Sequence, residues 1–326
     1  MVINIVSNQT NKKAIRGPKK VLINLLKGLD LIGVEYVLNQ PISKFRYNWI
    51  QDSLSSLIAA SLSDIPVLLG PNLVEMPNDL PLLRSKIPKG SIYLHPSKWT
   101  KDKWLENGFK ESIIEEWPVG IDTTTFGFID RSKLAHKVLI YFKNRKDSEL
   151  KYCINLLNKC GLNYSVLKYG EYTEEEFLSN LFNSTYCIWI GIDESQGIAL
   201  QEVLSTNLPI IIVKDQNSAN KRYKASPAPY FSSKCGIILD DIDSLNELTV
   251  RTFDPKIYNP RNYILENLSL EICAREFLKK ISSIKNDKQK IFDFKCIGIL
   301  VYLVQLPFHL KTYKSITRKI KRIKCF

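Results

Sequence analysis

A regular alternation of short apolar runs with amphipathic stretches most constrains what this 326-residue chain can fold into. Runs rich in Val, Ile and Leu predict buried strands, and apolar residues spaced by three and four predict helices. The helix face from Val21 to Ile32 ends at Gly33 and separates the first two runs, so a strand–helix–strand unit of a parallel sheet is expected. The runs in this part of the chain are 2–7, 34–39, 66–69, 91–94 and 113–119.

The same alternation starts again after residue 131. Strand-like runs at 137–143, 163–169, 186–191, 208–213 and 236–239 enclose amphipathic segments near 147–160, 173–183 and 197–206. Two such sets predict two doubly wound α/β domains, 1–130 and 131–285, with the hinge within 123–136 and a C-terminal helix and basic tail over 286–326. Open α/β sheets bind ligands at the carboxyl ends of their strands, so a binding cleft is expected between the two domains.

Composition restricts the class of protein. Hydrophobic residues make up 44% and charged residues 24% of the chain, which is typical of a soluble globular protein and excludes a wholly disordered or multi-span membrane chain. The net charge is +13, but residues 294–326 contain eight basic residues and no acidic one. The basic excess is therefore largely a property of the tail, and it invites anionic lipid, nucleic acid or phosphorylated ligands as partners.

The cysteines and the N-terminus indicate a reducing compartment. Seven cysteines are an odd number, none forms a C-x-x-C pair, and none stands close to one of the three histidines, so neither a disulfide framework nor a zinc site is expected. The six-residue apolar run at the N-terminus is shorter than the core of a signal peptide. We expect a cytoplasmic protein.

The segment 188–213 is the most informative stretch for chemistry. It is expected to form a strand, a tight loop bracketed by Gly191 and Gly197, a helix and a second strand. Backbone amides at the helix start could face an anion, as helix N-termini do with phosphate. Glu194 before the helix and Glu202 inside it could accept hydrogen bonds from sugar hydroxyls. The pattern suits a ligand with a polyol end and a phosphate end, or else an N-cap and a solvated glutamate.

At this point the sequence resembles a known family, the retaining glycosyltransferases of the two-domain GT-B type (family 4), which use nucleotide sugars. The resemblance is carried by Glu194-x7-Glu202, with Gly197 three residues after the first glutamate, and by three further segments in the expected order along residues 2–280. These are Gly17-Pro18-Lys19-Lys20 after the first strand, His95-Pro96-Ser97-Lys98-Trp99, and Pro118-Val119-Gly120-Ile121-Asp122-Thr123-x-x-Phe126.

The resemblance implies two Rossmann-like domains facing a cleft and a role for individual residues. Glu202 would bind the ribose hydroxyls and Glu194 would lie near the donor sugar. Lys143 and Arg145 would neutralise the diphosphate leaving group without a metal, and no cofactor besides the donor substrate is expected. The remaining donor-binding positions implied are Ser195, Gln196, Gly197, Ile198 and Gly17.

Some positions depart from the family. The compact Lys143-x-Arg145-Lys146 replaces a longer basic motif, and the only histidine before the hinge is His95, in a strand-end motif without a catalytic residue in the family. The first domain is short, so it says little about the acceptor. The turn 169–172 and the long loop 226–236 could contact the nucleotide, or be ordinary loops.

The tail raises the question of a membrane. The uncharged run 296–310 has 15 residues, fewer than the ~20 needed to cross a bilayer. It could lie at an anionic membrane surface with the cations that follow, or pack on the first domain. The sequence thus predicts a nucleotide-sugar-dependent hexosyltransferase that acts on a glycan or lipid-linked acceptor. The alternatives are a sugar-nucleotide epimerase, a non-catalytic nucleotide-sugar-binding protein, or a protein that binds nucleic acid or a membrane surface. Specific nucleic-acid binding is not expected, because the basic residues are not interleaved with aromatic ones.

Overall fold

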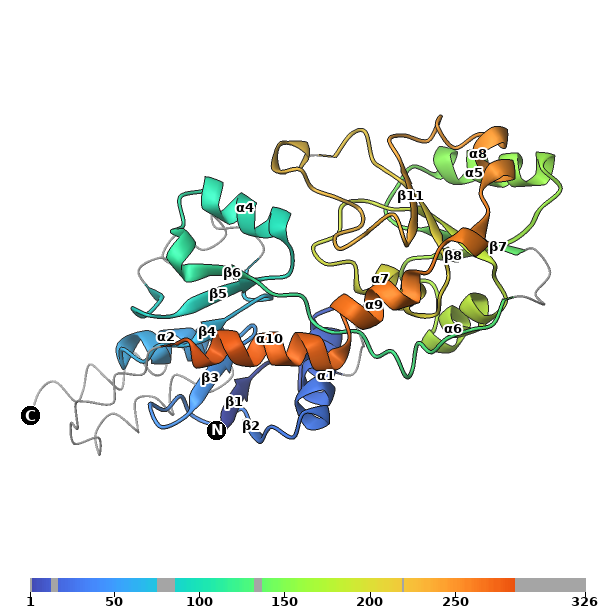
Figure 1. The fold of residues 1–326 in the computed structure, drawn as a ribbon. Helices are drawn as coiled ribbons and strands as arrows, with labels where there is room; N and C mark the ends of the chain where they lie inside the picture. The colour runs from blue at the N-terminus through green and yellow to red at the C-terminus, as the bar shows by residue number, and fades with distance from the viewer. Residues whose placement is uncertain (1, 13–16, 75–85, 132–136, 219, 285–326) are drawn as a thin grey trace, which may run out of the picture.

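The computed structural model describes residues 2–12, 17–74, 86–131, 137–218 and 220–284. It has two α/β domains side by side, each built on a parallel sheet with helices on both faces (Figure 1). The two doubly wound domains predicted from the alternation of strands and helices are confirmed.

The first domain contains a six-stranded sheet in the order β2-β1-β3-β4-β5-β6. Every pairing is parallel, so all carboxyl ends lie along one edge. The strands are β1 (Ile3–Val6), β2 (Tyr36–Leu38), β3 (Tyr47–Ile50), β4 (Leu68–Leu69), β5 (Ile92–His95) and β6 (Ile114–Glu116). The helices are α1 (Gly17–Leu31), α2 (Leu54–Leu62) and α4 (Lys98–Glu106), with a short 3₁₀ turn, η2 (Glu111–Ile113), before β6.

Strand β3 is the one strand that the sequence analysis did not anticipate. It has only four residues, and the buried polar side chain of Asn48 stands among them. Asn48 accepts a hydrogen bond from the side-chain amide of Asn4 on β1 at 3.1 Å. A polar side chain satisfied by the neighbouring strand breaks the apolar run by which strands were recognised.

The second domain contains a five-stranded parallel sheet in the order β11-β10-β9-β7-β8. Its strands are β7 (Lys137–Phe142), β8 (Asn163–Lys168), β9 (Tyr186–Ile190), β10 (Ile210–Val213) and β11 (Gly236–Leu239). Its helices are α5 (Asp147–Lys159), α6 (Glu174–Phe182), α7 (Ile198–Ser205), α8 (Glu247–Thr252) and α9 (Pro260–Asn267), with the short turns η3 (Lys221–Tyr223) and η4 (Pro255–Ile257). All five predicted strands and the three predicted helices of this domain are present.

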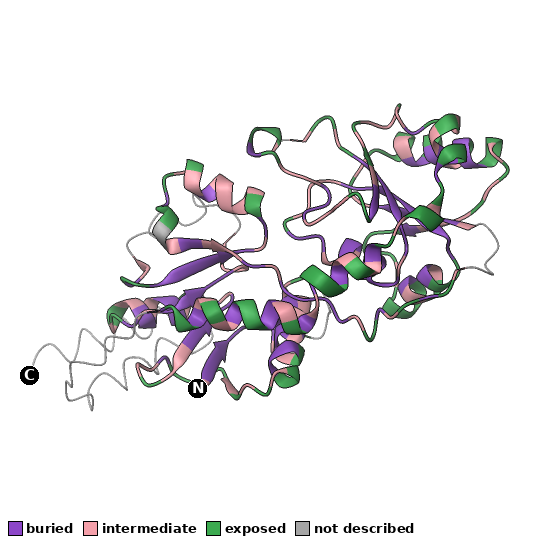
Figure 2. Cartoon of the chain, viewed as in Figure 1, coloured by how far each residue is buried: buried purple, intermediate pink, exposed green. Residues whose placement is uncertain are grey.

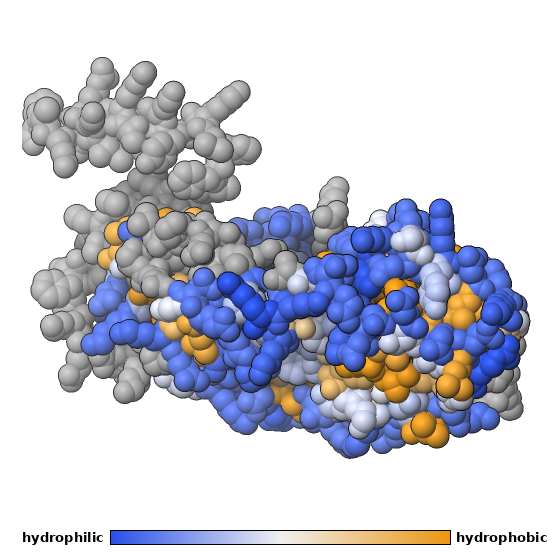
Figure 3. Space-filling model, turned by 90° about the horizontal axis from the view of Figure 1, so that it is seen from above, coloured by the Kyte–Doolittle hydropathy of each residue, from blue (hydrophilic) through white to orange (hydrophobic). Residues whose placement is uncertain are grey.

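Buried residues follow the sheets in both domains, and exposed ones cover the outer helix faces (Figure 2). Each sheet has an apolar core on either face. Seen from above, hydrophilic side chains cover most of the surface, and hydrophobic ones gather in smaller patches on the second domain (Figure 3). Each sheet is therefore packed on both faces, as is typical of doubly wound α/β domains.

Helix α10 (Leu270–Ser282) belongs to the first domain in space, although it follows the second in sequence. It runs back along the first domain, away from the second (Figure 1). Its Phe277 and Ile281 are fully buried in the core formed by β1, α1 and Trp49. A Cβ on Gly28 of α1 would lie 2.7 Å from the carbonyl oxygen of Leu270, so glycine permits the close helix crossing.

The domain limits therefore differ from the predicted 1–130 and 131–285. Ile121, Phe126 and Ile129 already pack in the core of the second domain, so the chain crosses between domains near Gly120. It returns between α9 and α10, where the amide of Ile121 donates to the carbonyl of Leu268 at 2.8 Å. Apolar periodicity lapses in 123–131 because these residues form an irregular segment, which nonetheless contributes side chains to a core.

The predicted tail, 286–326, lies outside the described residues. Among the residues that are described, none of the helices combines the length and the apolar character that a bilayer crossing requires. The five described cysteines are all free thiols.

Candidate functional site

Each sheet has one point where the chain reverses its direction of strand addition. In the second sheet this point lies between β7 and β9, and in the first sheet between β1 and β3. Loops that leave two adjacent strands in opposite directions open a crevice at the carboxyl edge, where α/β proteins bind ligands. Lys143 follows β7, and the loop 191–197 with Glu194 follows β9. The topology thus brings these predicted residues to one crevice.

Glu202 lies on α7 and is 2% exposed. Lys20, on α1 of the other domain, donates to both of its carboxylate oxygens, at 2.6 and 2.7 Å. Burial raises the pKa of Glu202 to about 7, against the Lys20 ammonium, which acts to lower it. Sequence analysis identified Glu202 but missed Lys20, because nothing in the sequence relates two residues 182 positions apart.

Glu194 is paired with Lys143 inside the second domain. The lysine ammonium lies 2.6 Å from a carboxylate oxygen. The Lys143 side chain is 16% exposed, and the Glu194 side chain is 14% exposed. Burial raises the pKa of Glu194 above its usual value, and the lysine charge opposes that shift. The ammonium also lies 4.5 Å from the centre of the Tyr169 ring, so the predicted turn 169–172 borders this pair.

Trp99 holds the backbone of Glu194 from across the cleft. The indole nitrogen of this α4 residue donates to the carbonyl oxygen of Glu194 at 2.9 Å. The Pro96-Ser97-Lys98-Trp99 segment therefore connects the first domain directly to the loop that bears the first motif glutamate.

The loop before α7 is fixed by glycine geometry and by Gln196. Gly197 caps the helix with a left-handed φ of 82°, a conformation that glycine adopts without strain. Ile198 is the first residue of the helix, and the first backbone amides of α7 have no acceptor within the helix itself. The Gln196 side chain is buried and hydrogen-bonded to both backbone groups of Val119 and to Gln201, so it joins the loop to the interdomain linker. Ser195 is exposed.

Arg145 has a different setting from Lys143. Its side chain is only 4% exposed and forms a two-pronged ion pair with Glu149 of α5. It also donates to the carbonyl oxygens of Gly191 and Val213, at 3.0 and 3.2 Å. Arg145 thus clamps the ends of β9 and β10, and Lys143 is the predicted cation whose charge faces a motif glutamate.

Gly17 and His95 of the first domain take no part in the contacts described so far. Gly17 was expected in a glycine-rich turn, but it is the first residue of α1, and the four residues before it are outside the described part. His95 is buried in the core, stacked on Tyr93 with ring centres 5.0 Å apart. Burial lowers the pKa of His95 to about 3, so it stays neutral and does not face the cleft residues described above.

A polar pocket lies at the corresponding crevice of the first sheet. Its volume is about 660 Å³, and it opens at the carboxyl ends of β1, β2 and β3 and the start of α2. Uncharged polar side chains dominate its lining, and Asp52 contributes a carboxylate that accepts from the amide of Asn8 at 2.8 Å. The polar lining residues are Ser7, Asn8, Thr10, Asn11, Asn39, Gln40, Asp52, Ser53, Ser55 and Ser56. Sequence analysis did not identify any of them.

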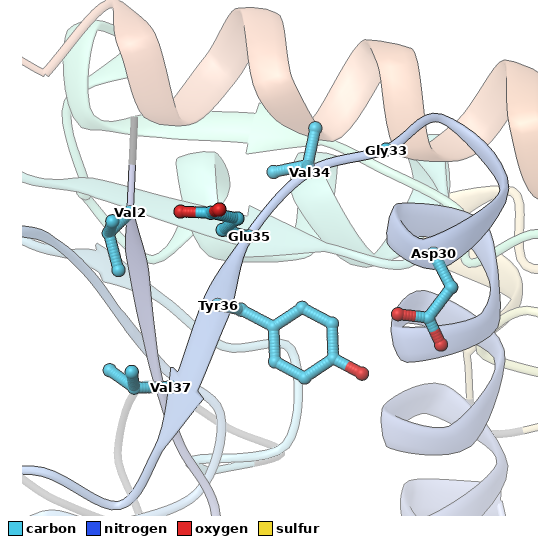
Figure 4. A pocket seen from close by; sticks show the side chains of 7 residues that line it. All are labelled: Val2, Asp30, Gly33, Val34, Glu35, Tyr36 and Val37. Atoms are coloured by element: carbon cyan, nitrogen blue, oxygen red, sulfur yellow. The ribbon is translucent and has the colours of Figure 1, made fainter.

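A second pocket, of about 540 Å³, lies elsewhere, on the outer strand of the first sheet. It is lined by Val2, by the end of α1 and by β2, and Tyr36 extends between β2 and α1 toward Asp30 (Figure 4). None of the predicted site residues lines it, and it opens on strand β2, away from α7.

The long loop between β10 and β11 closes one side of the cleft. The hydroxyl of Tyr230 donates to a carboxylate oxygen of Glu116 at 2.6 Å and lies 3.0 Å from the carbonyl oxygen of Pro96. Lys103 of α4 reaches the side chain of Asn220 at 3.0 Å. The loop predicted over 226–236 thus lies at the cleft and bridges the two domains.

Comparison with known proteins identifies the architecture. No protein-family model and no curated protein sequence matches this chain. A sucrose-phosphate synthase from Thermosynechococcus elongatus superposes with a TM-score of 0.56 at 11% identity, over 85% of this chain and 97% of that one. The catalytic domain of starch synthase IV from Arabidopsis thaliana, bound to ADP and acarbose, gives 0.57 at 10% identity, over 87% and 99%.

This chain has the GT-B fold. The lipopolysaccharide outer core galactosyltransferase WaaB shares it too, with a TM-score of 0.50 at 12% identity over 87% of this chain and 99% of WaaB. The fold expected from the Glu194-x7-Glu202 resemblance, two Rossmann-like domains facing a cleft, is confirmed. At such identities the likeness concerns the fold, so the chemistry depends on the residues of this chain.

Proposed function

We propose that the protein is a glycosyltransferase that moves a sugar from a nucleotide-diphosphate sugar to a glycan or lipid-linked acceptor. The observation that carries the proposal is the buried pair of Glu194 with Lys143 at the carboxyl edge of the second sheet, next to the helix α7 that bears Glu202, in a chain with the GT-B fold. Two buried carboxylates with lysines beside them provide acceptors for sugar hydroxyls and cations for a diphosphate.

Five residues of the second domain, around the start of α7, have separate roles in this proposal. The Glu202 carboxylate accepts hydrogen bonds from the ribose hydroxyls, and Glu194 orients the donor sugar. Amides at Gly197 and Ile198 face the diphosphate at the start of α7, where the helix dipole favours negative charge. Ser195 is the exposed residue of the same loop, and it can reach the donor from there.

The chemical step separates the sugar from the diphosphate, so negative charge develops on the leaving group. Lys143 stabilises that charge, and the pairing of its ammonium with Glu194 keeps it oriented before the reaction. We propose transfer of a hexose with retention and without a metal, because a lysine and a helix start supply positive charge where it is needed. Arg145 supports this arrangement by holding the ends of β9 and β10.

The acceptor would enter from the first domain. The polar pocket at β1, β3 and α2 offers hydroxyl, amide and carboxylate groups of the kind that bind sugar hydroxyls. Its position at the crevice of the first sheet suits a glycan. A peripheral location at an anionic membrane surface, held by the basic tail, would suit a lipid-linked acceptor.

A thermal-shift experiment tests the proposal. The melting temperature of the wild type is measured with uridine, guanosine and adenosine diphosphates and their sugar esters, because a ligand that binds only the native state raises it. We expect stabilisation by one base class, and loss of that stabilisation in Glu202→Ala. No shift with any nucleotide would contradict the proposal.

A further inference from the structure

The ion pair between Lys20 and Glu202 engages both oxygens of the carboxylate that the proposed function assigns to the ribose. The ammonium lies 2.6 and 2.7 Å from them, and the glutamate side chain is 2% exposed. A ribose diol needs two acceptor positions on a carboxylate, and these are the same positions. The lysine and the diol therefore compete for one group.

The pair also joins the two domains. Lys20 is the fourth residue of α1 in the first domain, and Glu202 lies on α7 in the second. The ammonium additionally sits 5.4 Å from the centre of the Phe126 ring, and Phe126 belongs to the core of the second domain. The lysine is thus held by two groups of the domain opposite its own.

We propose that Lys20 is an internal competitor of the nucleotide, a latch that occupies Glu202 and ties the two domains together until a nucleoside diphosphate displaces it. This inference rests on the proposed function, because it takes Glu202 as the ribose-binding group. It adds that binding the nucleotide breaks one interdomain contact, so the affinity measured for the nucleotide includes the cost of breaking it.

The other contacts between the domains do not involve Glu202, so they can persist when the pair opens. Trp99 holds the Glu194 backbone, Tyr230 holds Glu116, and Gln196 holds Val119. Helix α1 also keeps the pair of Lys27 with Asp122, at 2.6 Å, so loss of the Lys20 contact frees Glu202 and removes one of several interdomain contacts.

Calorimetric titration with the nucleoside diphosphate tests the latch. Lys20→Met removes the ammonium and keeps most of the stem. We expect it to bind the nucleotide about fivefold to tenfold more tightly than the wild type, a typical size for a coupling between two binding events. The titration is made at pH 9, because the pKa of Glu202 is about 7 in the wild type and rises further when the Lys20 charge that lowers it is removed.

Lys159→Met is the control. Lys159 forms an ion pair with Glu247 in which its own side chain is mostly exposed, and the structure shows no contact of either residue with Glu202, so its loss should leave the nucleotide affinity unchanged. If Lys20→Met fails to fold, Lys20→Gln removes the charge and keeps a hydrogen-bond donor, and a smaller gain is expected.

The outcomes separate this inference from the proposed function. Tighter binding by Lys20→Met in a wild type that binds supports the latch. Equal or weaker binding by Lys20→Met in a wild type that binds overturns the latch and leaves the proposed function standing. No binding by the wild type or by any variant overturns the proposed function, and the latch with it.

Discussion

At the scale of single residues, Glu202 combines deep burial with a role in the proposed site. The analysis of residues 188–213 identified it with Glu194, because a glutamate before a helix start and another one inside the helix are visible in a sequence. Three contacts of the site cannot be seen in the sequence, because each joins residues distant along the chain. They are the ion pair of Glu202 with Lys20, the hydrogen bonds of Gln196 to Val119, and those of Arg145 to the ends of β9 and β10. The sequence shows the two glutamates, and only the fold shows which lysines pair with them.

Glu202 should make stability depend on pH. Its pKa of about 7 in the folded chain lies above the ordinary 4.5, so the folded state binds more protons between these values, and stability falls as the pH rises from about 4.5 to about 7. Burial is the main cause of the raised pKa. The charge of Lys20 acts to lower the pKa, and the charges of Glu174 and Asp122 act to raise it. We expect Glu202→Gln to remove this loss, on the order of 3 kcal/mol, in urea unfolding at a series of pH values. Parallel pH profiles of the two proteins would contradict the assignment.

Arg145 should contribute mainly to the stability of the fold. Removing the buried Arg145 leaves Glu149 without its partner, so Arg145→Met should lower the free energy of unfolding by about 3 kcal/mol. Chemical denaturation measures this loss. Arg275→Met, which breaks an exposed ion pair with Glu271, is the control and should leave the unfolding midpoint nearly unchanged. An Arg145→Met protein as stable as the wild type would mean that the clamp contributes nothing to the fold.

At the scale of elements, the strands were predicted well where apolar runs are continuous. Strands β7, β9 and β10 are buried along their whole length apart from the first residue of β7, and their runs stood out in the sequence. β3 was missed because the buried Asn48 interrupts its apolar pattern, and its polar partner lies on β1. The packing of α10 on the first domain could not be predicted either. An amphipathic pattern shows that a helix has an apolar face, but it does not show which core that face packs against.

The crossing of α1 and α10 at Gly28 should tolerate no added side chain. Gly28→Val places carbon against the backbone of Leu270 and the Cβ of Ala274, where one Cβ alone would lie 2.7 and 2.9 Å away. We expect a loss of about 1–3 kcal/mol in unfolding free energy from overpacking.

Gly17→Ala is the comparison for this variant, because a Cβ at Gly17 has no neighbour within 4 Å among the described residues and should not destabilise the protein. The melting temperatures of both variants and the wild type are compared by calorimetry. A Gly28→Val protein that melts with the wild type would show that α10 does not pack here.

At the scale of the whole molecule, the second domain carries the paired glutamates, and the first domain carries a polar pocket at the crevice of its sheet. The two domains could be predicted from local patterns in the sequence. The pocket could not, because its polar lining comes from the ends of three strands and the start of a helix, with no motif among them.

The basic tail should govern attachment to membranes and leave the donor site untouched. A chain ending at residue 284, the last described residue, should lose co-sedimentation with vesicles that contain anionic lipid, and should keep its affinity for the nucleotide. Vesicles of neutral lipid serve as the control. Equal co-sedimentation of the truncated and full chains would contradict a role for the tail.

The measurement that tests the central claim most directly is release of nucleoside diphosphate from a panel of nucleotide sugars, with glycan and lipid-linked acceptors present. The wild type should release it from one donor class, and Lys143→Met should do so at least about a hundredfold more slowly, because a single group that stabilises the departing charge is worth that much. Release at equal rates by both proteins would remove Lys143 from the chemistry. Binding of the nucleotide without any release would contradict a glycosyltransferase and favour a protein that only binds nucleotide sugars.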